Sequence, residues 1–196
     1  MENKNMKKLL GAAAVGSGLI ALYTVSKNKK NPENTLTMII NSSIDKVFNY
    51  VLPINLTHIF RGSMIIPAII NTSIKEGWDH AGLVRTLYFK GGSTSRESLL
   101  TMSAPKSFSY KNDRFTSPLF RSLIESLEGE WSFTDLGNEQ TKIEWTYRAI
   151  PKNSGARVLI DTVLMKQVNS MQLNALTIIK KDLESNQLAG TKFAEV

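Results

Sequence analysis

The sequence predicts an α+β domain in which a curved antiparallel sheet of about seven strands wraps around one long C-terminal helix. Three observations carry this prediction. Apolar and polar residues alternate with period two over most of 74–150, apolar residues recur at helical spacing over 156–184, and two short helical patterns follow the first strand pattern. A sheet and a helix that each have one apolar face are most simply buried against each other.

The first strand and the two short helices are expected over 35–60. Residues 35–41 alternate and predict a half-buried strand. Ser42 or Ser43 can cap a short helix that ends before Pro53, and a second short helix is expected over 54–60. These helices lie where they can close one side of the sheet.

A hairpin over 82–102 carries a charged pair. Its strands flank the turn Lys90-Gly91-Gly92. A three-residue turn places Arg85 opposite Glu97 on one face, whereas a two-residue turn places Arg85 opposite Ser98 and separates the charges. Arg85 and Glu97 are therefore expected either as a structural ion pair or as polar anchors for a ligand.

Three further strands are expected at 107–115, 127–135 and 141–150. The segment 117–126 is less regular and is expected as a gate or as a covering loop. Alternation in the three strands places one set of mostly bulky residues on the inner face: Phe108, Tyr110, Leu127, Gly129, Trp131, Phe133, Ile143, Trp145, Tyr147 and Ala149.

The long helix is expected over 156–184, which contains neither proline nor glycine. Residues 186–196 are expected to form a loose tail. Because a strongly bent sheet and a helix seldom fill the space between them, a cavity lined by aromatic residues is expected. The helix should face it with an apolar stripe of Ile160, Leu164, Val168, Met171, Ala175 and Ile178, widened by Leu159, Val163 and Ile179.

The N-terminal segment contains 18 consecutive uncharged residues, 9–26, with lysines on both sides. This pattern favours an uncleaved membrane anchor. A cleaved signal, which would leave the protein secreted or periplasmic, is the first alternative, although Tyr23 and Val25 interrupt the small residues needed for cleavage. An ordinary soluble helix is the second. Residues 1–34 would then be an anchor or signal plus linker, ahead of a ligand-binding domain at 35–185.

Composition disfavours several classes of function. The chain has no cysteine and two histidines without metal-ligand spacing, so no metal site or cofactor is predicted. A net charge of +7 is typical of proteins that bind nucleic acids. Residues 1–34, however, account for +4 of this charge, with six Lys and two Glu. The remainder is only mildly basic, and nucleic-acid binding is not expected.

Several segments resemble the SRPBCC superfamily, which includes START lipid-transfer domains, birch-pollen-allergen-like proteins and bacterial polyketide cyclase/dehydrase-like proteins. The segments are SSIDKVFNYVLPI at 42–54, GWDHAGLVRTLYFKGGSTSRESL at 77–99, and GEWSFTDLG followed by TKIEWTYRAIPK up to Lys152. The resemblance implies a helix-grip fold around a hydrophobic ligand. It also implies that the Arg of a Gly-x-x-Arg strand and a Glu of the next strand face the cavity, which corresponds here to Arg85 after Gly82, and to Glu97.

The function expected is binding of a hydrophobic small molecule or lipid by a membrane-associated or exported domain. No catalytic residue is assigned. The expected ligand-binding residues are Trp78, Arg85, Leu87, Glu97, Phe108, Tyr110, Trp131, Phe133, Trp145 and Tyr147.

Two alternatives belong to other classes. One is a cyclase or dehydratase that uses Glu97 together with Arg85, His58 or Tyr110. The other is a protein-interaction module displayed at the membrane, which would require a large exposed apolar patch.

Overall fold

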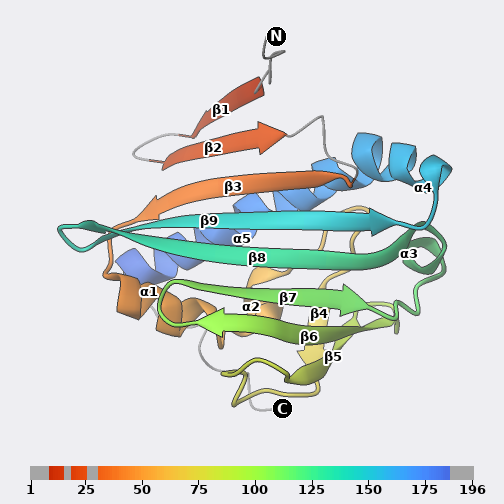
Figure 1. The fold of residues 1–196 in the computed structure, drawn as a ribbon, viewed down its shortest axis with the longest axis horizontal. Coiled ribbons are helices and arrows are strands. Elements are labelled where there is room, and N and C mark those ends of the chain that lie inside the picture. The colour runs from red at the N-terminus through yellow and green to blue at the C-terminus, as the bar shows by residue number, and fades with distance from the viewer. Residues whose placement is uncertain (1–8, 16–18, 26–30, 186–196) are drawn as a thin grey trace, which may run out of the picture.

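The computed structural model describes residues 9–15, 19–25 and 31–185, and its core is one curved antiparallel sheet with a long helix on its inner side (Figure 1). Nine strands form the sheet in the order β1-β2-β3-β9-β8-β7-β6-β5-β4. Six of them, β3 and β5 to β9, are strands that the sequence predicts, and β4, which the alternation pattern does not place, completes the seven strands expected. Their bounds are Glu33–Ile40 for β3, Ile69–Thr72 for β4, Val84–Phe89 for β5, Thr94–Ser103 for β6, Ser107–Asp113 for β7, Ile124–Gly137 for β8 and Gln140–Pro151 for β9.

The N-terminal segment forms strands where a helix was expected. A membrane anchor or a soluble helix over 9–26 would be helical. Leu9–Val15 is strand β1 and Leu19–Val25 is strand β2, and β2 pairs with β3 in antiparallel register. A physical reason is that β3 would otherwise present an edge of unpaired backbone groups, which β2 satisfies. None of the helices in the described ranges combines the length and the apolar character needed to cross a membrane.

Two short helices follow β3 as expected. Helix α1 spans Ile44–Val51 and buries Val47, Phe48, Tyr50 and Val51, and helix α2 spans Leu56–Ile59. The side chain of Asn55 caps α2 by accepting a hydrogen bond from the Thr57 N–H at 3.0 Å. Segment 117–126 contains helix α3, Pro118–Leu123, and β8 begins directly after it.

The C-terminal helix is interrupted by one π-helical turn, which the sequence pattern does not reveal. Helix α4 spans Ser154–Leu159, the π turn η1 spans Ile160–Leu164, and helix α5 spans Met165–Glu184. The Met165 N–H donates to the Ile160 carbonyl, five residues back, so this turn holds one extra residue.

The extra residue rotates the apolar stripe of the helix. Two residues that were predicted to widen this stripe therefore do not belong to it. Leu159 and Val163 were expected to face the sheet, but they are 42% and 39% exposed. Ile160, Leu164 and Val168 face inward as expected, and Met165 joins them.

A buried glutamine fastens α5 to the sheet. The Asn34 amide donates to the Gln172 side chain at 2.6 Å, and Gln172 donates to the Trp145 carbonyl at 3.1 Å. Gln172 is fully buried, so its polar groups need these partners. The contacts hold α5 at a set distance from β3 and β9 and define one wall of the interior.

Candidate functional site

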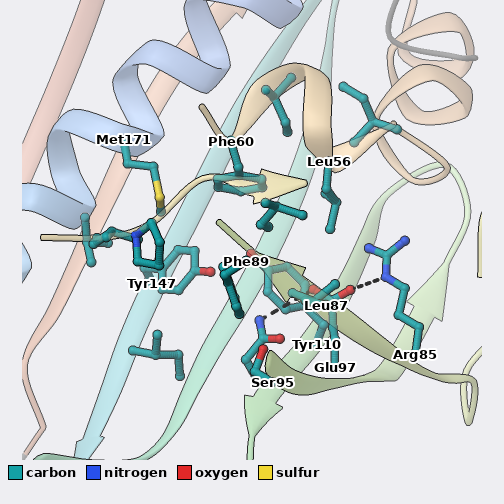
Figure 2. A pocket seen from close by; sticks show the side chains of 18 of the residues that line it. Leu56, Phe60, Arg85, Leu87, Phe89, Ser95, Glu97, Tyr110, Tyr147 and Met171 are labelled. Carbon is teal, nitrogen blue, oxygen red and sulfur yellow. Dashed lines mark hydrogen bonds and ion pairs between the residues drawn. The ribbon is translucent and has the colours of Figure 1, made fainter. Parts of the chain in front are cut away.

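A cavity lies between the inner face of the sheet, α5 and the segment that carries α1 and α2. Figure 2 shows Leu56 and Phe60 on the side of the short helices and Ser95, Glu97 and Tyr110 on the side of the sheet. Met171 of α5 contributes a third wall. The lining is predominantly apolar, with a few polar groups from β5 to β9.

The cavity is narrow. Its volume is about 90 Å³. A water molecule needs about 10–15 Å³ of such space, so the cavity has room for roughly six to nine water molecules or for one compact organic molecule. This volume lies below the usual range for drug-sized ligands, which is about 300–1,000 Å³.

The Arg85–Glu97 pair forms as the three-residue turn predicts. The two residues are direct partners in the β5–β6 register, and the Arg85 Nε donates to Glu97 Oε2 at 2.5 Å. Both side chains are 5% exposed. Trp78 covers the guanidinium, whose carbon lies 4.1 Å from the indole centroid, and Asn112 donates to the other Glu97 oxygen at 3.5 Å. The positive charge of Arg85 and the negative charge of Glu97 thus neutralise each other at the cavity wall.

An aromatic row crosses three strands beside this pair. Phe108 of β7 is paired with Trp131 of β8, and Trp131 with Trp145 of β9. The Phe108 and Trp131 rings stack with centroids 5.7 Å apart, and the Trp131 and Trp145 rings at 4.2 Å. The row supplies a rigid apolar floor for the cavity.

The next row has a glycine in its centre. Gly129 of β8 lies between Tyr110 of β7 and Tyr147 of β9. A Cβ on Gly129 would lie 2.2 Å from Cζ of Tyr110, so the tyrosine ring occupies the space that a side chain would take. The Tyr110 and Tyr147 rings meet edge to face with centroids 6.1 Å apart. The glycine therefore brings both phenol rings together at the cavity.

Both tyrosines hold their protons strongly. Burial raises the pKa of Tyr147 to about 12, and the negative charge of Glu97 adds to this effect. Burial also raises the pKa of Tyr110 well above its ordinary value, with Tyr147 and Glu97 adding to the shift. The two phenols are thus neutral hydrogen-bonding groups at physiological pH.

These shifts predict how stability depends on alkaline pH. A tyrosine whose pKa is higher in the folded than in the unfolded state contributes stability fully below pH about 10 and loses it as pH rises toward about 12. Urea unfolding at several alkaline pH values should show this decline, and Tyr147→Phe should flatten it. Tyrosinate absorbance should reveal two groups that ionise above the ordinary pKa range of tyrosine. A Tyr147→Phe profile as steep as that of the parent protein would contradict the assignment.

Nine of the ten predicted ligand-binding residues line the cavity. They are Trp78, Arg85, Leu87, Glu97, Phe108, Tyr110, Trp131, Trp145 and Tyr147. Phe133 is buried in the core instead, where its ring packs against Phe48 at 5.5 Å, because β8 carries it past the end of the cavity toward α1.

Sequence reasoning missed two groups of lining residues. The first comes from α1, α2 and the segment before β4, and includes Leu52, Leu56, Phe60 and Ile66. No local pattern tells which side of a short helix will meet a distant sheet. The second group is Ser95 and Asn112, which period-two alternation from Glu97 and Tyr110 could have placed on the inner face.

A second polar cluster ties the short helices to α5 outside the cavity. The Tyr50 hydroxyl donates to Asp182 Oδ2 at 2.5 Å, and His58 Nε2 lies 2.7 Å from the same oxygen. His58 is therefore engaged by Asp182 and does not line the cavity, so of the three partners considered for Glu97 in the cyclase alternative only Arg85 and Tyr110 lie beside it there.

Replacing Asp182 should loosen this connection. Asp182→Asn is expected to lower the free energy of unfolding by about 2 kcal/mol, because hydrogen bonds to a buried carboxylate are among the stronger ones. Chemical denaturation measures the change, with Asp161→Asn on the exposed side of the same helical segment as the control. An unchanged stability would show that the cluster does not hold the short helices in place.

In the part of the chain with described side chains, no three His, Asp or Glu side chains come together in a way that could hold a metal ion. The chemistry available at the cavity is hydrogen bonding by neutral groups, one balanced ion pair and extensive aromatic contact.

Comparison with solved structures identifies the fold. Ara h 8.0201 matches with a TM-score of 0.60 and 17% identity over 80% of this chain and 99% of its own. A START superfamily protein from Mycobacterium smegmatis matches with a TM-score of 0.55 and 9% identity, over 79% and 99%. The Zhui aromatase/cyclase from Streptomyces sp. R1128 matches with a TM-score of 0.54 and 18% identity, over 80% and 95%. No family model matches the sequence, and no curated protein matches it significantly. The chain thus has the START-like helix-grip fold that its sequence predicts.

Proposed function

We propose that this chain, which has the START-like helix-grip fold, binds a small hydrophobic molecule in the cavity between the sheet and α5. The observation that carries the proposal is an interior that remains open although aromatic and aliphatic residues of nine helices and strands converge on it. Packed protein interiors contain few voids larger than a water molecule, so a cavity of this size and lining needs a reason. A bound apolar ligand would fill it.

Native mass spectrometry and solvent extraction of the gently purified protein test the proposal. We expect one apolar molecule per chain. Leu87→Trp should fill the cavity and abolish this occupancy, whereas Tyr88→Trp, on the adjacent and 39% exposed residue, should leave it unchanged. A protein that stays empty with every apolar compound offered, and whose stability rises in Leu87→Trp, would overturn the proposal.

A second candidate function is catalysis of the cyclase or dehydratase kind, and the position of Glu97 favours it. The carboxylate lines the cavity beside the neutral Tyr110 hydroxyl, as a general acid or base would. Glu97→Gln should then abolish turnover of a polyketide-like substrate while it retains binding. Retained turnover would remove this candidate.

Membrane tethering through residues 9–26 is a further element of the proposal, supported by the uncharged run and its flanking lysines. Fractionation of cells that express the full chain tests it. Recovery with membranes, lost on deletion of residues 1–30, supports an anchor, and recovery of a shortened chain outside the cell supports a cleaved signal. Recovery of the full chain in the soluble fraction contradicts both.

A further inference from the structure

Two polar atoms at the cavity have no hydrogen-bond partner among the described residues. They are the Ser95 hydroxyl oxygen and the Asn112 carbonyl oxygen Oδ1. Both residues line the cavity, and they are 2% and 5% exposed. Buried polar atoms are nearly always paired, so these atoms indicate where a polar group of a ligand would lie.

The chemistry of the two atoms defines the group that would satisfy them. The Glu97 carboxylate only accepts hydrogen bonds, so Asn112 must donate to it through Nδ2, and Oδ1 is left to accept. The Ser95 hydroxyl both donates and accepts. A hydroxyl group, which also donates and accepts, is the simplest complement to this set.

The charge balance of the site argues against an ionised ligand. Arg85 and Glu97 already neutralise each other, and Trp78 covers the guanidinium. A ligand carboxylate would be buried near Glu97 with no cation of its own, and a ligand ammonium would face a carboxylate that is already paired. Both would lose their hydration without full compensation.

The shape of the site adds a limit on size. The rings of Phe108, Trp131 and Trp145 stack on one another and line the site with apolar aromatic surface, and the cavity of about 90 Å³ has room only for a compact molecule. A fused pair of rings meets both conditions better than a long acyl chain.

From these observations we infer that the cavity selects a compact, uncharged ligand whose ring system packs against the aromatic row and whose hydroxyl group bonds to Ser95 and Asn112. The inference rests on the proposed function and narrows it to one ligand class.

Three probes with the same ring system test it: 2-naphthol, naphthalene and 2-naphthoate at neutral pH. Titration followed by tryptophan fluorescence and calorimetry should show 2-naphthol binding about five- to tenfold more tightly than naphthalene, the equivalent of one net hydrogen bond. 2-Naphthoate should bind more weakly than either. Equal affinity for 2-naphthol and naphthalene, or tightest binding of 2-naphthoate, would overturn the inference and leave the proposed function standing.

Variants locate the hydroxyl contact. Ser95→Ala and Asn112→Leu should each reduce the preference for 2-naphthol over naphthalene to about twofold or less, while naphthalene affinity stays within about twofold. Ser98→Ala, the same change on β6 with its side chain on the opposite face of the sheet, should leave the preference intact. A preference unaffected by both cavity variants would contradict the inference. If none of the three probes binds while an apolar molecule is found in the purified protein, the ring-and-hydroxyl inference fails and ligand binding stands.

Discussion

Glu97→Ala is expected to lower the free energy of unfolding by about 3–5 kcal/mol. The substitution removes one partner of a buried ion pair and leaves the Arg85 guanidinium, 5% exposed, with Trp78 and without a counter-charge. It also removes the acceptor of the Asn112 amide. Urea unfolding measures the loss.

Two comparisons separate the buried pair from ordinary charge effects. Glu128→Ala removes a carboxylate that lies 3.3 Å from Arg148 at the sheet surface, where both side chains are about one-third exposed, and it should cost less than about 1 kcal/mol. The double variant Arg85→Met/Glu97→Leu should recover much of the stability, because no charge is then stranded. Similar losses of unfolding free energy in Glu97→Ala and Glu128→Ala would show that burial does not strengthen the Arg85–Glu97 ion pair.

Gly129→Val is expected to cost about 3 kcal/mol, although valine ordinarily favours strands. The added Cβ would lie 2.2 Å from Cζ and 2.5 Å from the hydroxyl oxygen of Tyr110, so the ring must leave its place against Tyr147. The displacement would also push the phenol into the cavity. We expect weaker ligand binding together with the loss in stability.

The matched control is Glu130→Val, one position along the same strand and exposed on the outer face, which should be close to neutral. In a Tyr110→Ala background the cost of Gly129→Val should nearly vanish, and this coupling identifies the ring as the cause. A cost that persists in that background would mean that the backbone, not Tyr110, requires glycine.

The local pattern was sufficient for most of the sheet. Alternation predicted β7, β8 and β9 with their inner residues, because the side-chain period of a strand allows only two faces and one of them is polar here. The turn Lys90-Gly91-Gly92 limited the partner of Arg85 to Glu97 or Ser98, because turn length sets the register of a hairpin. The structure has the three-residue turn and pairs Arg85 with Glu97.

Long-range geometry decided the remainder. Residues 9–15 and 19–25 form strands because β3 offers an edge to pair with, and the composition of these residues carries no information about that edge. Leu159 and Val163 turned outward because one π turn shifts the helix register, which a regular periodicity cannot anticipate.

The amino-acid order determined which residues share a face, where strands turn and which charges meet across a hairpin, since these depend on neighbours a few positions apart. The volume of the cavity, the exclusion of Phe133 from it and the unpaired atoms of Ser95 and Asn112 depend on how far α5 and the short helices stand from the sheet. That separation arises from the combined packing of segments more than one hundred residues apart, such as Asn34 against Gln172, and no local sequence pattern encodes it.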